Sequence, residues 1–491
     1  MAVYRARAAD SQTRIAAHVG WTHVDLATGR YREAIERLRS VSTEGESNSD
    51  WHAALADALA EVGEYDDALA HGRRALALAA DNVHARYRLA RLLERLGRRD
   101  EAVALYEWFD KLLHDHLPER ADELTDAGRG FYRYSVLTRH ENLKDRCRYV
   151  LQEVYQEAYE FVDSRYWPAR LAAAELMLEK HNLNEATSDL RRVLQANGKA
   201  TGAYVGLAAA ALENWNFDEA EKQANKALEV NPRCAAALLA LGRTRMLERR
   251  YEQAEKVARQ MLATNPRDIE GLALLAAAQL RSDQPEAAAA TAKRLEAFAP
   301  HSAALHFELG YWLSAGRQYA DSERELRAAI AADPTWPEPR TELGLLLMQS
   351  GDERGARREL EAAWQLDSFN HQTFNVLGLL DELEKFATYD AGPFTLRYDP
   401  AEDSAALPFM ARRLKGIYSD VTKLFGFEPT QKTTIEIFPQ HSRFSVRITG
   451  RPWIHTVGAC TGPIIAIDAP REGASIAPYN WASTLRHEFS H

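Results

Sequence analysis

The chain has 491 residues, of which 46% are hydrophobic and 27% charged, and its formal net charge is −10. That length predicts about two to four domains with a sizeable core, and no apolar run reaches the length of a membrane span. The excess of acidic residues lies before Tyr389, which argues against nucleic acid as a partner.

The N-terminal segment and the cysteines both bear on location. The stretch from Met1 to Arg7 lacks the apolar core of a secretory signal, and we assign residues 1–14 to an N-terminal helix or tail. The three cysteines, Cys147, Cys234 and Cys460, are widely separated, which predicts free thiols in a reducing compartment. We therefore expect a cytoplasmic protein.

Residues 15–370 repeat with a period of 34. A small residue marks the period best, with Tyr or Phe often three residues before it, Gly often five before, Leu often thirteen before, and Pro often twelve after. The small residues are Ala34, Ala68, Ala102, Ala186, Ala220, Ala254, Ala288, Ser322 and Ala356. Small residues let two helices approach closely, Gly suits the turn between them, and Pro ends the second helix.

This pattern resembles the tetratricopeptide repeat, a helix-turn-helix unit of 34 residues, over about seven tenths of the chain. The resemblance implies a mostly α protein with a right-handed α-solenoid, in arrays at residues 15–116 and 167–370, that binds a protein or peptide on its concave face. We expect nine repeats. They begin near Ile15, Ser49, Val83, Trp167, Thr201, Ala235, Ile269, Ala303 and Pro337.

Two further helical segments flank these arrays. Residues 117–166 break the register but keep a helical pattern, which indicates either one divergent repeat with lengthened helices or a hinge between two sub-arrays. Their many aromatic residues suit a packed core better than a contact surface. Residues 371–388 read as a helix that covers the open end of the array.

Residues 389–491 change to an α+β pattern. We expect, in chain order, a strand, a helix, a strand, a short helix, a strand and a final helix that begins after Asn480, a suitable N-cap. The first five elements are Phe394–Tyr398, Leu407–Phe425, Thr433–Phe438, Ser442–Ile448 and Gly462–Asp468.

The final helix carries the H-E-x-x-H motif at His487, Glu488 and His491. On a helix, two histidines four residues apart stand on the same face, so both imidazoles can reach one zinc ion. Glu488 is then placed to act as the general base toward a water molecule. The alternative is an ordinary amphipathic helix with two surface histidines.

The element order and the motif resemble the first half of a gluzincin-type metallopeptidase domain, related to thermolysin and the zinc aminopeptidases. The resemblance implies that His487 and His491 are Zn²⁺ ligands, that Glu488 is the base, and that the strand Gly462–Asp468 lies at the sheet edge. There it would pair with substrate through Gly462, Ile464, Ile465 and Ala466, although a plain edge strand fits the pattern equally well. The Gly-x-Met-Glu-Asn signature of the aminopeptidases is absent, which favours an endopeptidase or an undefined specificity.

A zinc site needs a third protein ligand, which the resemblance places beyond His491. We therefore read residues 389–491 as an incomplete peptidase domain, in a fragment that binds zinc weakly and is inactive while the full-length protein hydrolyses peptide bonds. Two other readings stay open: a non-catalytic repeat scaffold with a degenerate peptidase domain, and a domain that only caps the fold. His441, His455 and Cys460 are irregularly spaced and suit packed or surface positions better than a metal cluster.

Overall fold

The computed structural model describes residues 13–300, 302–471, 473 and 475–491, so nearly all of the predicted tail at 1–14 lies outside the described residues. The chain divides into two compact units, one ending at Trp312 and the other spanning Leu313–His491. In the part of the chain that is described, no helix is long and apolar enough to cross a membrane.

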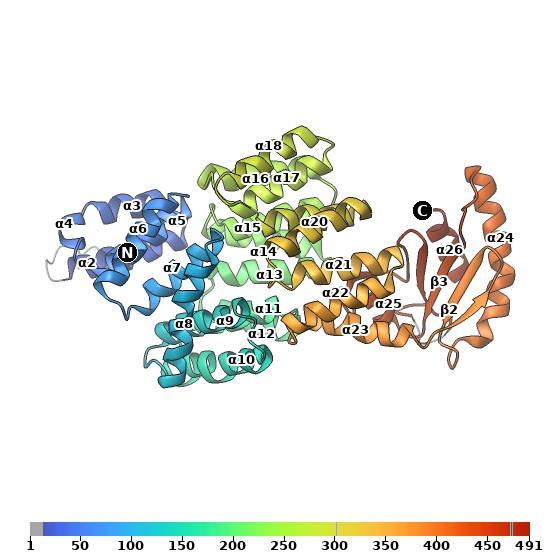
Figure 1. Ribbon diagram of the computed structural model, residues 1–491, viewed down its shortest axis with the longest axis horizontal. Helices are drawn as coiled ribbons and strands as arrows, with labels where there is room; N and C mark the ends of the chain where they lie inside the picture. The colour runs from blue at the N-terminus through green and yellow to red at the C-terminus, as the bar shows by residue number, and fades with distance from the viewer. Residues whose placement is uncertain (1–12, 301, 472, 474) are drawn as a thin grey trace. The chain divides into compact units, whose positions relative to one another are not determined.

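The first unit is a series of helix pairs, which follow one another along the chain in Figure 1. Each first helix packs against its own second helix and against the first helix of the next pair. The pairs are α2 (Arg14–Ala27) and α3 (Tyr31–Arg39), followed by the short α4 (Ser42–Gly45); α5 (Ser49–Glu61) and α6 (Tyr65–Leu78); α7 (Val83–Arg95) and α8 (Arg99–Asp115); α11 (Trp167–Glu179) and α12 (Leu183–Ala196); α13 (Thr201–Glu213) and α14 (Phe217–Val230); α15 (Ala235–Leu247) and α16 (Tyr251–Thr264); α17 (Ile269–Arg281) and α18 (Pro285–Glu296).

The first helices begin within one residue of the predicted repeat starts, and α19 (Ala303–Ala315) and α21 (Glu338–Ser350) continue the series. The small-residue column is buried at every repeat, with an exposed fraction of at most 7%. The reason is the one that the pattern indicates: a small side chain at this position lets the two helices of a pair approach closely.

The register break at residues 117–166 is itself a helix pair. Its first helix is α9 (Ala121–Leu137), and its second runs through α10 (Leu143–Tyr149) into the π-helical segments η1 (Val150–Tyr155) and η2 (Glu157–Val162). α9 packs against both α7 and α11, so the stack of first helices continues through the break. This agrees with one divergent repeat whose helices are lengthened, and the wider π turns accommodate the added residues.

The turn inside each repeat uses a left-handed backbone conformation. Glycine occupies this turn position at Gly29, Gly63, Gly97 and Gly351, as the sequence pattern indicates. The other repeats adopt the same positive φ with residues that have a Cβ atom, namely Arg139, His181, Trp215, Arg249, Asp283 and Arg317. A side chain in this conformation costs roughly 1 kcal/mol or more.

Replacing Arg249 by Gly is therefore expected to stabilise the first unit by about 0.5–1 kcal/mol, the relieved strain less the added freedom of the unfolded chain. Arg249 has a φ of 59° and is exposed, and its side chain makes no hydrogen bond or ion pair among the described residues. Urea unfolding measures the change. Arg249→Ala is the matched control and should gain nothing, because alanine keeps the Cβ atom; equal stability of the two variants would contradict the strain.

The first repeats of this unit also contact repeats about 200 residues later. The Tyr31 hydroxyl donates to the Arg233 carbonyl (3.4 Å) and accepts from the Asn231 side chain (3.2 Å). One repeat on, the Tyr65 hydroxyl makes the same two bonds with Arg267 (3.1 Å) and Asn265 (2.9 Å). A third contact joins Arg95 to Asp268 at 2.8 Å and to Glu270 at 2.9 Å. The first three repeats are thus held to residues 231–233 and 265–270 of the same unit.

Replacing Gly63 by Ala tests these contacts. Its φ is +79°, and an added Cβ would lie 2.2 Å from Oδ1 of Asn265, a side chain that is 4% exposed. Gly97 has nearly the same φ, +73°, but open space around it, so Gly97→Ala carries the backbone strain alone. We expect Gly63→Ala to cost about 1–3 kcal/mol more than Gly97→Ala in urea unfolding. Equal costs would contradict the contact.

The second unit combines the last helix pairs with a five-stranded sheet in the order β1-β2-β3-β5-β4. Two of its strands, β2 and β3, are labelled in Figure 1. β1 and β4 are antiparallel to their neighbours, and the three inner strands are parallel. Its remaining elements are α20 (Tyr319–Ala332), α22 (Glu353–Leu366), α23 (His371–Leu383), β1 (Ala387–Asp390), β2 (Phe394–Tyr398), the 3₁₀ turn η3 (Ser404–Ala406), α24 (Leu407–Phe425), β3 (Thr433–Phe438), α25 (His441–Thr449), β4 (Gly458–Cys460), β5 (Ile464–Asp468) and α26 (Trp481–Phe489).

Apolar side chains of the inner strands form the core of this sheet domain. Leu396, Ile435 and Ile465 lie in one cluster with Leu414 of α24 and Leu485 of α26, so these two helices share a core with one face of the sheet. α25 packs against β3 and β5 as well. All six elements predicted from the alternation of the sequence are present in the predicted order, and β1 and β4 are additional.

A buried ion pair joins this sheet to the last repeats. Glu436 of β3 is fully buried and accepts from Arg447 of α25 at 2.6 Å; Arg447 is itself only 1% exposed. Arg447 also donates to the Met348 carbonyl in α21, at 3.0 Å. Arg397 of β2 contacts Glu436 at 2.9 Å and also pairs with Glu353 of α22. Helices and strands of the second unit therefore share one polar network.

Candidate functional site

The helix α26 presents the motif residues on defined faces. The Asn480 side chain accepts from the Ser483 amide at 3.1 Å, which is the N-cap that the sequence predicts. Leu485 is fully buried, and the Phe489 ring packs against Phe394 with 4.9 Å between centroids. These anchors leave His487 exposed to solvent.

His487 and His491 lie on the same exposed side. Their Nε2 atoms are 3.2 Å apart, although regular helix ends at Phe489. Two ligands held at 2.0–2.1 Å by one tetrahedral zinc ion stand about 3.3 Å apart. The separation of the two Nε2 atoms matches that of two such ligands, and it is also the length of a hydrogen bond between the two rings.

Glu488 packs against the sheet. It is 9% exposed, and a Cβ added at Gly458 would lie 3.4 Å from its Cγ and 2.5 Å from Thr484 Cγ2. The absence of a side chain at Gly458 thus lets α26 approach β4 closely. As a result the carboxylate lies beside the end strand of the sheet.

The prediction that Gly462–Asp468 forms the sheet edge is wrong. The strand is β5, and it pairs with β3 on one side and β4 on the other. Ile465 and Ala466 face Cys460 and Ala459 across the β4 ladder, so their backbone groups are already bonded within the sheet. The strand β4, which the sequence analysis missed, covers this side and is itself the edge.

Gly462 and Ile464 are also displaced from their predicted role. Gly462 lies in the turn between β4 and β5 with a φ of +111°, which favours glycine, and the strand starts only at Ile464. The Ile464 carbonyl accepts from the Thr461 amide at 2.9 Å and so closes the hairpin. The run Thr-Gly-Pro between two short apolar stretches was the available hairpin signal.

The edge of β4 is partly occupied within the chain. In an antiparallel pair alternate residues turn their backbone groups outward, and here these residues are Gly458 and Cys460. The Gly458 carbonyl accepts from Thr456 Oγ1 at 3.0 Å, and the Cys460 carbonyl accepts from Arg317 at 2.8 Å. In the described chain, the outward amides of Gly458 and Cys460 have no such partner.

His441 belongs to a separate buried cluster. Its Nδ1 lies 2.9 Å from Asp468 Oδ2, and its Nε2 lies 2.8 Å from the Ile454 carbonyl. Burial raises the pKa of Asp468, and the contact with His441 only partly offsets this. Within the described residues, no group of three His, Cys, Asp or Glu side chains could hold a metal ion.

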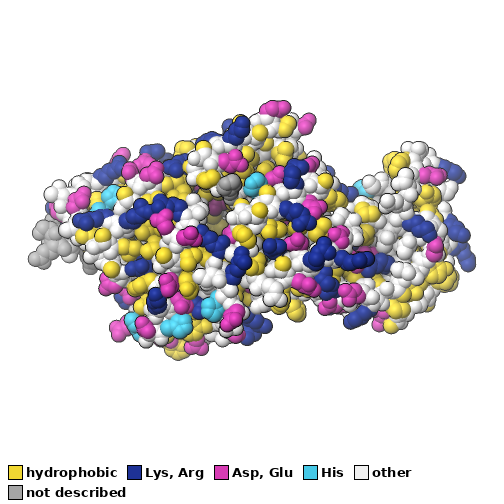
Figure 2. All heavy atoms as spheres, in the orientation of Figure 1, with side chains coloured by type: hydrophobic (Ala, Val, Ile, Leu, Met, Phe, Trp, Pro, Cys, Tyr) yellow, Lys and Arg dark blue, Asp and Glu magenta, His cyan; other side chains and the backbone are white. Residues whose placement is uncertain are grey.

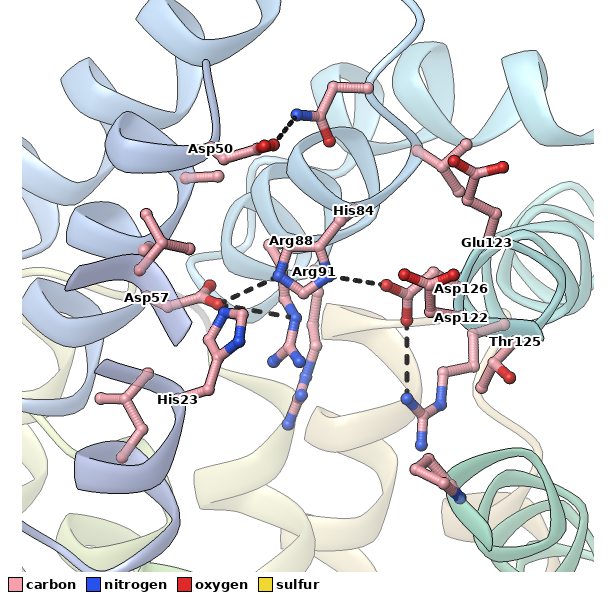
Figure 3. Close-up of a pocket in the computed structure, with 18 of the residues that line it drawn as sticks. His23, Asp50, Asp57, His84, Arg88, Arg91, Asp122, Glu123, Thr125 and Asp126 are labelled. Carbon is pink, nitrogen blue, oxygen red and sulfur yellow. Dashed lines mark hydrogen bonds and ion pairs between the residues drawn. The ribbon is translucent and has the colours of Figure 1, made fainter. Parts of the chain in front are cut away.

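The first unit contains a pocket of about 860 Å³, lined by α2, α5, α7, α9 and the start of α11 (Figure 3). At its centre His84 of α7 lies between two carboxylates, 3.4 Å from Asp57 of α5 and 2.8 Å from Asp126 of α9. Arg88 stands 3.8 Å from Asp57, and Arg129 stands 3.6 Å from Asp126. This network crosses three successive repeats, and no motif in the sequence indicates it.

Both protonation equilibria at the centre of the pocket are shifted. Burial alone would lower the pKa of His84, but the hydrogen bonds with Asp126 and Asp57 outweigh it and raise the pKa to about 9. Burial would raise the pKa of Asp57, but Arg88 and His84 outweigh it and lower the pKa to about 2. At neutral pH the cluster is fully charged.

The stability of the first unit should therefore fall at both ends of the pH scale. The contribution of His84 is complete below pH 6.5 and is lost as the pH rises toward about 9, while that of Asp57 is complete above pH 3.8 and is lost toward about 2. Thermal unfolding against pH should show both declines, and His84→Gln should remove the alkaline one. The effect should be modest, because 37% of the His84 side chain is exposed. An unchanged alkaline decline would contradict the assignment.

Comparison with known families identifies the helix pairs. Two family models described as tetratricopeptide repeat match residues 25–71 and 59–107, and residues 205–269. The chain therefore contains tetratricopeptide repeats, which the helix pairs continue as far as α22. Neither family model reaches residues 389–491. A search of curated proteins gives no match.

Solved structures of repeat proteins resemble parts of the chain. Yeast Tom70 covers 76% of it and is itself covered to 90%, with 14% identity and a TM-score of 0.35. YrrB, described as a TPR protein with an unusual peptide-binding site, covers 36% of the chain and is itself covered to 92%, with 16% identity and a TM-score of 0.23. A thermophilic TPR protein of Thermus thermophilus covers 38% of the chain and is itself covered to 100%, with 21% identity and a TM-score of 0.30.

Proposed function

We propose that the chain is a protein-interaction scaffold fused to a zinc-dependent, peptidase-like domain. The carrying observation is the exposed imidazole pair, with Nε2 of His487 and Nε2 of His491 3.2 Å apart. Glu488 comes from the same helix and lies against the edge strand. Two imidazoles, a neighbouring carboxylate and a strand edge in one place are the parts that hydrolysis of an extended peptide needs.

The roles of these side chains follow from their positions. Zinc held by His487 and His491 would supply a Lewis acid that makes water more acidic. Glu488 would accept a proton from the attacking water. The outward amides of Gly458 and Cys460 would donate to carbonyl groups of the substrate. The outward carbonyls of both residues already accept hydrogen bonds within the chain, so the amides are the groups that a substrate would use.

The helix pairs would supply the partner-binding part of the function. Stacked repeats of this kind form extended binding surfaces, and a protein or peptide segment is the partner that such a surface suits. The pocket in the first unit gives this surface a polar recess of adequate size. Binding there would recruit a partner protein without any chemical reaction on that partner.

A non-catalytic scaffold is the second candidate. It is favoured by one observation: within the described residues, no third His, Cys, Asp or Glu completes a metal site with the histidine pair. Two protein ligands hold zinc more weakly than three. In that case the sheet domain would be a degenerate relative that keeps the histidines without catalysis.

Cleavage of casein decides between the two candidates. We expect zinc-dependent cleavage that Glu488→Gln lowers by about 10²- to 10⁴-fold, the range of general-base contributions. Thr484→Ser, on the same face, is the matched control and should retain activity. No cleavage at full zinc occupancy would support the scaffold instead, and equal cleavage by Glu488→Gln and wild type would rule out Glu488 as the base.

A further inference from the structure

The pocket in the first unit is lined by opposing charged faces. On α5, Asp50, Asp57 and Glu61 face it, and on α7 so do His84, Arg88, Arg91 and Arg95. Figure 3 shows Asp57 and Asp126 on either side of His84. Most of the cationic side chains in the lining form ion pairs with carboxylates of the protein, either in the pocket or outside it.

The ion pairs of the lining cations involve several carboxylates. Arg88 and His84 pair with Asp57, and Arg95 reaches Asp268 and Glu270, which lie outside the lining. Arg129 and Arg120, which line the opposite wall, also pair with carboxylates. Among the described residues, Arg91 alone of the lining arginines has no ion pair.

More carboxylates than cations are left without a partner. Glu61, Asp81 and Asp50 line the pocket, and no ion pair to any of them occurs in the described residues. Asp50 has only a neutral partner, the Asn82 amide at 2.9 Å. Burial raises the pKa of Glu61, although Arg91 and Arg95 act against it. A bound cation would act in the same direction as the two arginines.

We infer that this pocket binds a cationic segment of a protein partner, one whose Lys or Arg side chains reach Glu61 and Asp81. This inference rests on the proposed partner-binding function and names its partner class. The charges without an ion pair favour a cationic segment, because three such carboxylates and only one such guanidinium line the pocket. Figure 2 shows both signs of charge mixed over the face that it views, so no large acidic area lies on that face.

Fluorescence anisotropy with two labelled peptides tests the inference. One alternates Lys with Ala, the other Glu with Ala, and both are titrated with the whole chain at about 0.15 M salt. We expect the Lys peptide to bind more tightly. Glu61→Gln with Asp81→Asn should weaken it about ten-fold, the effect of two partly exposed ion pairs. The control pair Glu252→Gln and Glu286→Gln removes the same charge from exposed helix positions outside the lining and should change the affinity less than two-fold.

Arg91→Gln supplies a test that misfolding cannot imitate, because it should tighten binding of the Lys peptide by about three-fold. Tighter binding of the Glu peptide, no binding of the Lys peptide, or equal losses in the pocket and control variants would overturn the inference. Zinc binding at His487 and His491 is measured separately, and its result does not depend on this pocket.

Discussion

Replacing Glu436 by Gln is expected to lower the free energy of unfolding of the unit Leu313–His491 by about 3–5 kcal/mol. The reason is the state in which Arg447 is left. Its side chain is 1% exposed and its Nε lies 2.6 Å from Glu436 Oε2, so without that carboxylate a buried cation loses its counter-charge. The remaining bond to the Met348 carbonyl does not neutralise it. Urea unfolding followed by circular dichroism measures the loss.

The double variant Glu436→Leu with Arg447→Met is the control. Apolar side chains of similar volume often replace a buried ion pair at little cost, so the double variant should recover most of the stability that the single one loses. Arg397 keeps its partner Glu353 in both variants. A single variant that costs less than about 1 kcal/mol, or a double variant no better than the single, would contradict the assigned role of the pair.

Replacing His487 by Ala is expected to weaken zinc binding by about 100-fold or more, because it removes one of only two imidazoles. Competition against a chromophoric chelator measures the affinity. Glu488→Gln should leave zinc affinity nearly unchanged, since Glu488 packs against β4 and the proposed ligands are the two imidazoles.

His455→Ala is the matched control for this measurement. His455 is exposed, and its ring packs against Trp453. It precedes the final helix by more than twenty residues in the sequence. Its loss should not change the affinity at the motif. If His455→Ala and His487→Ala weakened zinc binding equally, the metal would be held by scattered surface histidines, and the motif would have no special part.

The repeats could be predicted from the sequence because their information is local. The column that includes Ala68 and Ala254 marks where two helices cross, and the period of 34 carries that constraint along the chain. The strands and helices after Tyr389 were also readable, since alternation and amphipathic spacing are properties of single segments. Even the break near residue 140 kept a helical pattern.

The features that the sequence did not indicate depend on contacts between distant segments. The strand β4 is three residues long, and Gly458, Ala459 and Cys460 show no alternation, so only its pairing with β5 defines it. The contacts of Tyr31 and Tyr65 span about 200 residues, and nothing local announces them. Likewise the positive φ of Arg249 is imposed by the repeat and contradicts its own preference.

The candidate site divides in the same way. The Nε2 atoms of His487 and His491 lie 3.2 Å apart, although only His487 belongs to the helix α26. Their use as zinc ligands stays a prediction. The substrate edge was assigned to the wrong strand, since strand order is not contained in the sequence of one strand. Arg317, which covers the Cys460 carbonyl, comes from a repeat turn and could not be expected from the motif.

Anomalous diffraction at the zinc absorption edge, from crystals of the protein grown with zinc, tests the central claim most directly. A peak 2.0–2.1 Å from Nε2 of both His487 and His491 is the predicted result, with Glu488 outside bonding distance of the metal. Zinc found only elsewhere, or no peak between these two imidazoles, would contradict the proposed metal centre.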